Sequence, residues 1–140
     1  MGTINWQRVL LGGIVAGIVV FVIDFVSFGF LFNSIVNSAF EALGRSFEDG
    51  GPMQLVLFIG TSLLTGIAAV WLYAAIRPRF GAGARTATVA GLTVWLLVYV
   101  LPGLGLTSTL FPASLVIASI GVGLFESLVA THAGAYLYQE

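Results

Sequence analysis

Four apolar stretches dominate the pattern of hydrophobic and polar positions along the 140-residue chain. They cover about residues 9–32, 53–76, 86–106 and 112–138. Each supplies the roughly 20 residues that a helix needs to cross a hydrocarbon layer of ~30 Å. Inside lipid every backbone polar group needs a partner within the chain, so the stretches are predicted to be helices rather than strands. The pattern therefore predicts an all-α fold, a bundle of four transmembrane helices that forms a single domain over residues 1–140.

A further helix is predicted between the first two stretches, at about residues 34–47. Apolar residues recur there at helical spacing, while Asn37, Glu41 and Arg45 fall on the opposite side. A helix with this amphipathic pattern lies in the plane of the membrane interface. We expect such an interfacial segment on the outer face of the bundle.

Composition supports a membrane protein. Hydrophobic residues make up 59% of the chain and charged residues 8%, and the mean hydropathy is +1.06. A soluble domain carries roughly 25% charged residues, so a soluble globule and a nucleic-acid-binding protein are excluded. Cysteine and lysine are absent, which excludes thiolate and Schiff-base chemistry. Because no catalytic or metal-binding motif occurs either, we expect no catalytic residue, no metal, no cofactor and no enzymatic activity.

The arginines predict the orientation of the four spans. Arg8, Arg77, Arg79 and Arg85 share one side with both termini, whereas Arg45 is alone on the other. Cytoplasmic loops of membrane proteins carry the excess of positive charge, so both termini are predicted to be cytoplasmic. Arg77, Arg79 and Arg85 are also candidates for binding anionic lipid headgroups.

Asp24 and Glu126 are the two acids within predicted spans. A carboxylate at such a depth costs roughly 2.5–3.5 kcal/mol on insertion scales and is a candidate functional group. Counting the helical rise places Asp24 nearer the outer face and Glu126 nearer the cytoplasm, about 10 Å or more apart in depth. This separation argues against a paired site; it leaves open two structural acids, or a proton path with water between them. The polar residues predicted at similar depths are Tyr99, Thr61 and Ser62 for Asp24, and Thr65 for Glu126.

His132 is the single histidine of the chain. It follows Glu126 by six residues, which places the two side chains about 120° apart around the helix and argues against a shared metal. Two interpretations remain open. His132 is either a hydrated histidine at the interface or an axial ligand to a haem or pigment.

Small residues at helical spacing predict close helix contacts. The pairs are Gly13 and Gly17 in the first span and Ala130 and Gly134 in the fourth. Such pairs let helix backbones approach in a membrane, either within one chain or between chains.

A parallel internal repeat is also suggested. Residues 10–20 loosely resemble residues 89–99, and residues 65–73 resemble residues 130–138. Both pairs run in the same direction across the membrane. Either a duplication or the limited apolar alphabet accounts for the similarity.

Three segments carry a resemblance to known proteins: residues 4–13 (INWQRVLLGG), 70–81 (VWLYAAIRPRFG) and 128–138 (LVATHAGAYLY). With these the chain resembles a group of small, uncharacterised bacterial integral membrane proteins with four helices. The resemblance implies four spans and the bacterial cytoplasmic membrane. It implies no activity and no role for any residue.

The leading functional hypothesis is a non-enzymatic structural or accessory subunit that packs with itself or within a larger membrane complex. Its expected partners are the lipid bilayer and other transmembrane helices, with no nucleic acid. The first alternative is a small transporter or channel that uses Asp24 and Glu126 for proton or cation coupling. The second is a haem- or pigment-binding protein ligated by His132.

Overall fold

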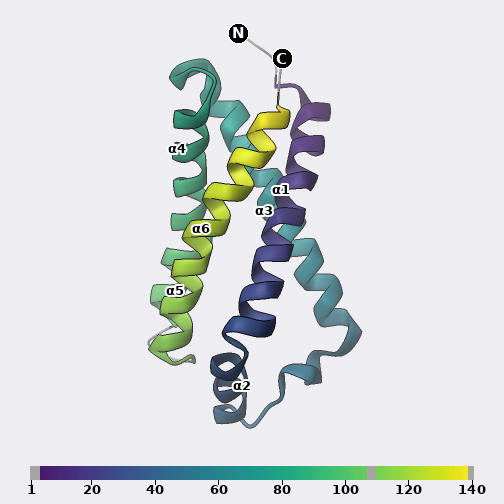
Figure 1. Ribbon diagram of the computed structural model, residues 1–140, viewed down its shortest axis with the longest axis vertical. Helices are drawn as coiled ribbons and strands as arrows, with labels where there is room; N and C mark the ends of the chain where they lie inside the picture. The colour runs from purple at the N-terminus through teal and green to yellow at the C-terminus, as the bar shows by residue number, and fades with distance from the viewer. Residues whose placement is uncertain (1–3, 107–109, 139–140) are drawn as a thin grey trace.

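The computed structural model describes residues 4–106 and 110–138, and every regular element in these ranges is a helix (Figure 1). Four helical segments are long and apolar enough to cross a membrane, which confirms the predicted number of long helices. They are Trp6–Leu31, Phe47–Phe80, Ala84–Leu106 and Ala113–Leu137. The predicted loop before the fourth helix falls largely on residues 107–109, outside the described ranges.

The first and third spans are not uniform α-helices. Helix α1 (Trp6–Val26) starts after Asn5, whose side chain accepts a hydrogen bond from the backbone N–H of Arg8, and continues as a π-helical segment. The third span contains a second π-helical segment. The elements are η1 (Ser27–Leu31) in the first span, and α4 (Ala84–Trp95), η3 (Leu96–Val100) and α5 (Leu101–Leu106) in the third. Neither π-helical segment was expected from the sequence.

Helix α3 (Gly51–Phe80) is the longest element, with 30 residues or about 45 Å of helical rise. A helix longer than the hydrocarbon layer tilts to fit it, and α3 leans strongly behind the other helices (Figure 1). Its end was predicted at residue 76, but the helix continues for one more turn through Pro78. It stops at Gly81, which has a positive φ of 86° and donates to the carbonyl of Arg77 over 2.8 Å.

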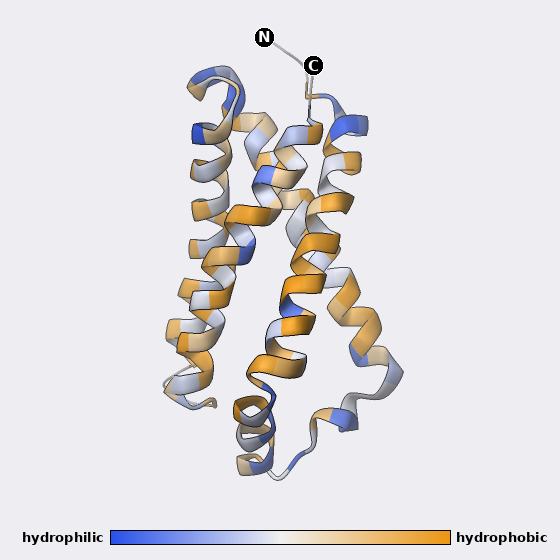
Figure 2. Cartoon of the chain, viewed as in Figure 1, coloured by the Kyte–Doolittle hydropathy of each residue, from blue (hydrophilic) through white to orange (hydrophobic). Residues whose placement is uncertain are grey.

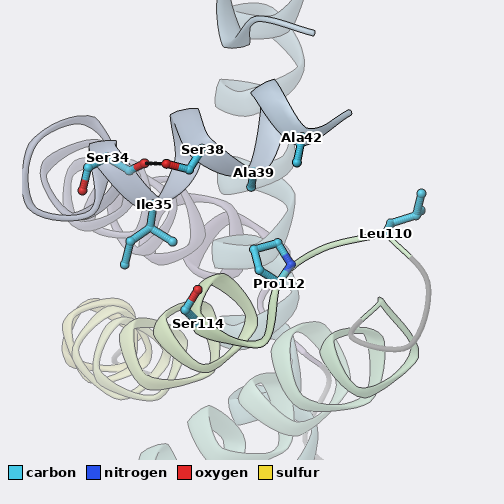
Figure 3. Close-up of a pocket in the computed structure, with 8 residues that line it drawn as sticks. All are labelled: Ser34, Ile35, Ser38, Ala39, Ala42, Leu110, Pro112 and Ser114. Atoms are coloured by element: carbon cyan, nitrogen blue, oxygen red, sulfur yellow. Dashed lines mark hydrogen bonds between the residues drawn. The ribbon is translucent and has the colours of Figure 1, made fainter. Parts of the chain in front are cut away.

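The predicted amphipathic segment is helix α2 (Asn33–Ala42), followed by the short 3₁₀-helix η2 (Phe47–Gly50). Val36 and Ala39 on α2 are buried, and its polar residues are exposed. Helix α2 lies over the start of α6 (Ala113–Leu137), and a hollow of about 520 Å³ separates the two (Figure 3).

The four long helices form a closed bundle. Helix α1 contacts α3 and α6, α4 contacts the same two helices, and α3 and α6 also contact each other. Both ends of the described chain and the turn between α3 and α4 lie at one end of the bundle, and α2 lies at the other (Figure 1). Hydrophobic residues cover the long helices between the two ends (Figure 2). This is the up-and-down arrangement predicted from the sequence.

Glycines set the distance between the helices. A Cβ added to Gly66 on α3 would meet backbone atoms of Gly13 and Gly17 on α1. A Cβ added to Gly12 on α1 would meet the carbonyl oxygen of Gly134 on α6. The predicted pairs of small residues therefore lie at helix–helix contacts within one chain, where close backbone approach requires them.

Two tyrosines join the elements at the end that carries the termini. The hydroxyl of Tyr138 accepts a hydrogen bond from the backbone N–H of Asn5, and that of Tyr73 accepts one from Gly83, both over 3.2 Å. The two rings contact edge to face at 6.1 Å, and the guanidinium of Arg77 lies 5.6 Å from the Tyr138 ring centroid. These contacts fasten the first residues, the last helix and the α3–α4 turn together.

Candidate functional site

Asp24 on α1 and Glu126 on α6 form one pair in the bundle interior. The two carboxyl groups lie close enough to interact directly. Glu126 is completely buried, and Asp24 is partly buried. The expected separation in depth, and the argument it gave against a paired site, are therefore wrong.

The contact between Gly12 and Gly134 explains how the two acids reach each other. Asp24 lies 12 residues beyond Gly12, and Glu126 lies 8 residues before Gly134. The two spacings differ by four residues, which offsets the backbone positions of Asp24 and Glu126 by about 6 Å along the helix axes. The two helices run antiparallel, and a Cα–Cβ bond tilts toward the start of its own helix, so the two side chains lean toward each other. The depth estimated from the sequence used only the helical rise of the backbone and did not include the direction of the two side chains.

The two carboxyl groups have each other as neighbours and lack other partners among the described residues. Both Glu126 oxygens and Oδ1 of Asp24 are buried and have no hydrogen-bond partner in this part of the chain. An ionised carboxylate only accepts hydrogen bonds, so the two groups can bond to each other only when one of them carries a proton. Buried unpaired oxygens are costly, so a proton shared by the pair would stabilise this part of the interior.

The hydroxyl groups expected near these acids form hydrogen bonds within their own helix. Thr61 donates to the carbonyls of Leu57 and Phe58, and Ser62 also donates to Phe58. Thr65 donates to the carbonyl of Thr61. Hydroxyl groups in membrane helices commonly bond to a carbonyl one turn earlier in this way. Hence none of the three is a donor to Asp24 or Glu126.

Tyr99, the remaining expected donor, belongs to the π-helical segment η3. Its ring packs on Gly123 of α6, where an added Cβ would meet the ring atoms. The ring also lines a small cavity of about 260 Å³ near Phe28 and Phe111. Tyr99 therefore contributes to the α4–α6 contact through packing of its ring.

A cavity of about 720 Å³ reaches Asp24 from the end that carries α2. It lies between the end of the first span, α2, η2 and the first half of α3. Apolar side chains form most of its wall. The polar lining residues are Asp24, Asn33, Asn37, Glu48, Gln54 and Thr61. Asp24 is the lining residue of α1 that is farthest from α2, so it lies at the inner end of the cavity.

The bundle is closed on the other side of the carboxyl pair. Ala16 and Val20 of α1, Val70 of α3 and Ala130 of α6 belong to one buried core, and all four are at most 3% exposed. This core lies between the pair and the end that carries the termini. The cavity thus approaches the pair from the end that carries α2, and a packed core lies on the other side of the pair.

The π-helical segment η1 begins three residues after Asp24. Its defining bond runs from the backbone N–H of Phe32 to the carbonyl of Ser27, five residues earlier, over 2.7 Å. Insertions of this type are frequent at functional sites in helices. We found no signal in the sequence for this segment, because Ser, Phe and Gly occur equally in regular membrane helices.

His132 links α6 to α4. Its Nδ1 lies 2.8 Å from the carbonyl oxygen of Leu128 and donates to it, because a carbonyl can only accept. Its Nε2 lies 3.3 Å from the hydroxyl of Thr88. Both ring nitrogens therefore have neighbours within the protein, and His132 is not brought next to Asp24 or Glu126.

The remaining candidates lie apart from the carboxyl pair. Arg79 and Arg85 are exposed at the end that carries the termini, where Arg77 packs on Tyr138. Among the described residues, no group of three or more acidic or histidine side chains could hold a metal ion. The site is thus defined by two carboxyl groups and the cavity beside them.

Comparison of the chain with protein-family models, curated proteins and solved structures finds no match. Functional inference rests on the geometry alone.

Proposed function

We propose that the chain is a small, non-enzymatic transporter or channel of the membrane that binds a proton or a small cation at Asp24 and Glu126. The observation that carries this proposal is the pair of adjacent, largely buried carboxyl groups at the inner end of a cavity. Intramembrane acids are costly, and those that face a bundle interior mark ion and proton pathways in many membrane proteins.

The cavity supplies a route for the proton at one end of the bundle. Asn37 and Glu48 at its rim are exposed, and Asp24 lies at its inner end. A proton that arrives at Asp24 passes to the neighbouring carboxyl group of Glu126. Release to the other end requires the core around Val20 and Ala130 to open, as alternating access demands.

Proton flux into vesicles tests the proposal. The purified chain is reconstituted into liposomes that contain a pH-sensitive dye, and a potassium diffusion potential drives proton entry. We expect flux well above that of protein-free vesicles, and flux near the protein-free level for Glu126→Gln. Glu41→Gln on the exposed side of α2 is the matched control and retains wild-type flux. Wild-type flux equal to that of protein-free vesicles would contradict the proposal.

An accessory subunit of a larger membrane complex is the second candidate, and one surface favours it. An apolar groove of about 610 Å³ runs between α1 and α6. It contains Gly121, where an added Cβ would meet nothing within 4 Å. Small residues in an open groove allow another transmembrane helix to approach closely. A partner that co-purifies with the wild-type chain, and is lost with Gly121→Leu, supports this role; a chain that is always alone and monomeric contradicts it.

The orientation belongs to the same proposal. We infer that the end with Arg8, Arg79 and Arg85 faces the cytoplasm of a bacterium, because positive charge is retained on that side. The arginines are placed to contact anionic headgroups there. In this orientation the cavity opens outward.

Haem ligation by His132 also remains a proposal, and a colourless purified protein would contradict it.

A further inference from the structure

The cavity beside Asp24 has the chemistry of a binding site for a hydrophobic organic cation. Its volume of about 720 Å³ falls within the range of ~300–1,000 Å³ found for small-molecule sites. Most of its wall is apolar, and a few polar groups are placed within it. This combination is typical of sites that take a whole small molecule rather than a bare ion.

Two acidic groups and no basic side chain line the cavity. Asp24 and Glu48 line it, and none of its lining residues is arginine, lysine or histidine. Oδ1 of Asp24 is buried and has no hydrogen-bond partner in the described part of the chain. A carboxylate in such surroundings is costly unless an opposite charge lies nearby, and a cation bound beside Asp24 would supply that charge.

Four phenylalanine rings complete the cation site: Phe25, Phe28, Phe47 and Phe58. The face of an aromatic ring carries negative potential and attracts organic cations. Each of these rings contacts a further phenylalanine that does not line the cavity. The ring pairs are Phe25 with Phe30, Phe28 with Phe32, Phe47 with Phe40 and Phe58 with Phe21, at 5.3–6.1 Å between centroids. These ring contacts help to position the aromatic wall.

We propose that this cavity binds a monovalent organic cation with apolar arms, of the ammonium or phosphonium class, with its charge next to Asp24. This inference rests on the proposed transport function and names the class of its substrate. The cation enters from the end that carries α2, and its apolar arms lie on the phenylalanine wall. Bound there, it places its positive charge beside the Asp24 carboxyl group.

Binding of tetraphenylphosphonium to the full chain in nanodiscs tests the proposal. We expect saturable binding of this cation and no comparable binding of tetraphenylborate, which has similar arms but the opposite charge. Asp24→Asn should weaken binding by about ten-fold or more, and Glu48→Gln should weaken it less. Asp49→Asn is the matched control, because Asp49 adjoins Glu48 in sequence but does not line the cavity.

The outcomes separate this proposal from the proposed function. Equal binding of the phosphonium and the borate, or wild-type affinity in both Asp24→Asn and Glu48→Gln, would overturn the cation site. Glu48 lies on the short exposed helix η2, so its variant retains the test if Asp24→Asn fails to fold. Proton flux in vesicles without phosphonium is measured in parallel. Flux without phosphonium binding rejects the cation site and retains the proton pathway, whereas binding without flux supports the site and rejects the pathway.

Discussion

The carboxyl groups of Asp24 and Glu126 lie next to each other across the contact between α1 and α6. Twelve residues of α1 and eight residues of α6 separate this pair from the close contact of Gly12 with Gly134, which lies toward the termini. The pair is a polar contact between two largely apolar helices. It therefore affects both the stability of the bundle and the chemistry that its interior can support.

The loss of stability on removal of the Glu126 carboxyl should depend on the side chain that replaces it. Glu126→Ala leaves Asp24 without its partner and creates a cavity, so we expect the free energy of unfolding to fall by about 2–4 kcal/mol. Glu126→Gln supplies an amide donor of similar size and should change it by less than about 1 kcal/mol. Reversible unfolding in detergent micelles, followed by circular dichroism, measures the difference.

The control for these variants is Glu41→Ala, since Glu41 is exposed on α2 and should change stability by no more than about 0.5 kcal/mol. Equal destabilisation by the alanine and glutamine variants would contradict this prediction, because it would show that an amide donor at position 126 does not restore the contact with Asp24.

Gly66 should be intolerant of any side chain. Gly66→Ala places a methyl group against the backbones of Gly13 and Gly17, so α1 and α3 must separate. We expect a loss of about 1–3 kcal/mol in the free energy of unfolding. Gly60→Ala on the same helix is the matched control, because an added Cβ there meets nothing within 4 Å. That variant should be as stable as the wild type or slightly more stable, and the same loss in both would refute the close contact.

The hydroxyl of Tyr138 should protect the start of the chain. Tyr138→Phe removes the acceptor for the Asn5 backbone N–H but retains the ring contacts with Tyr73 and Arg77. We expect faster hydrogen exchange at Asn5 and a loss of about 0.5–1.5 kcal/mol. Tyr136→Phe is the control, since the Tyr136 side chain is 77% exposed. Unchanged exchange at Asn5 in Tyr138→Phe would argue against this contact.

The number and type of the long elements were largely predictable from the sequence because long uncharged apolar stretches favour helices. Four such helices joined by short connections place both ends of the described chain at one end of the bundle (Figure 1). The interfacial helix was also predictable, since Val36 and Ala39 lie on one side of a strongly amphipathic segment. The last turn of α3 was missed because the predicted span was ended where the uncharged run ends, just before Arg77, whereas the helix continues to Phe80.

The site was predictable in its residues but not in its geometry. Asp24 and Glu126 were identified because they are acidic residues within long apolar stretches, whereas the other charged residues lie in loops or at the ends of the helices. Their pairing depends on the register that Gly12 and Gly134 impose and on the direction in which side chains leave antiparallel helices. Neither property can be read from the spacing within a single helix. The internal repeat remains a prediction, since no finding tests a duplication.

Chemical cross-linking between positions 24 and 126 tests the carboxyl pair most directly. The chain contains no cysteine, so Asp24→Cys/Glu126→Cys introduces the only two thiols. A short bifunctional thiol reagent is added to the protein in membranes, and trypsin then cleaves after Arg45 in the exposed segment that follows α2. Asp24→Cys/Phe125→Cys is the control, because Phe125 is 61% exposed and adjoins Glu126. We predict that the 24/126 fragments remain linked after cleavage whereas the 24/125 fragments separate; separation of the 24/126 fragments would contradict the pairing of Asp24 with Glu126.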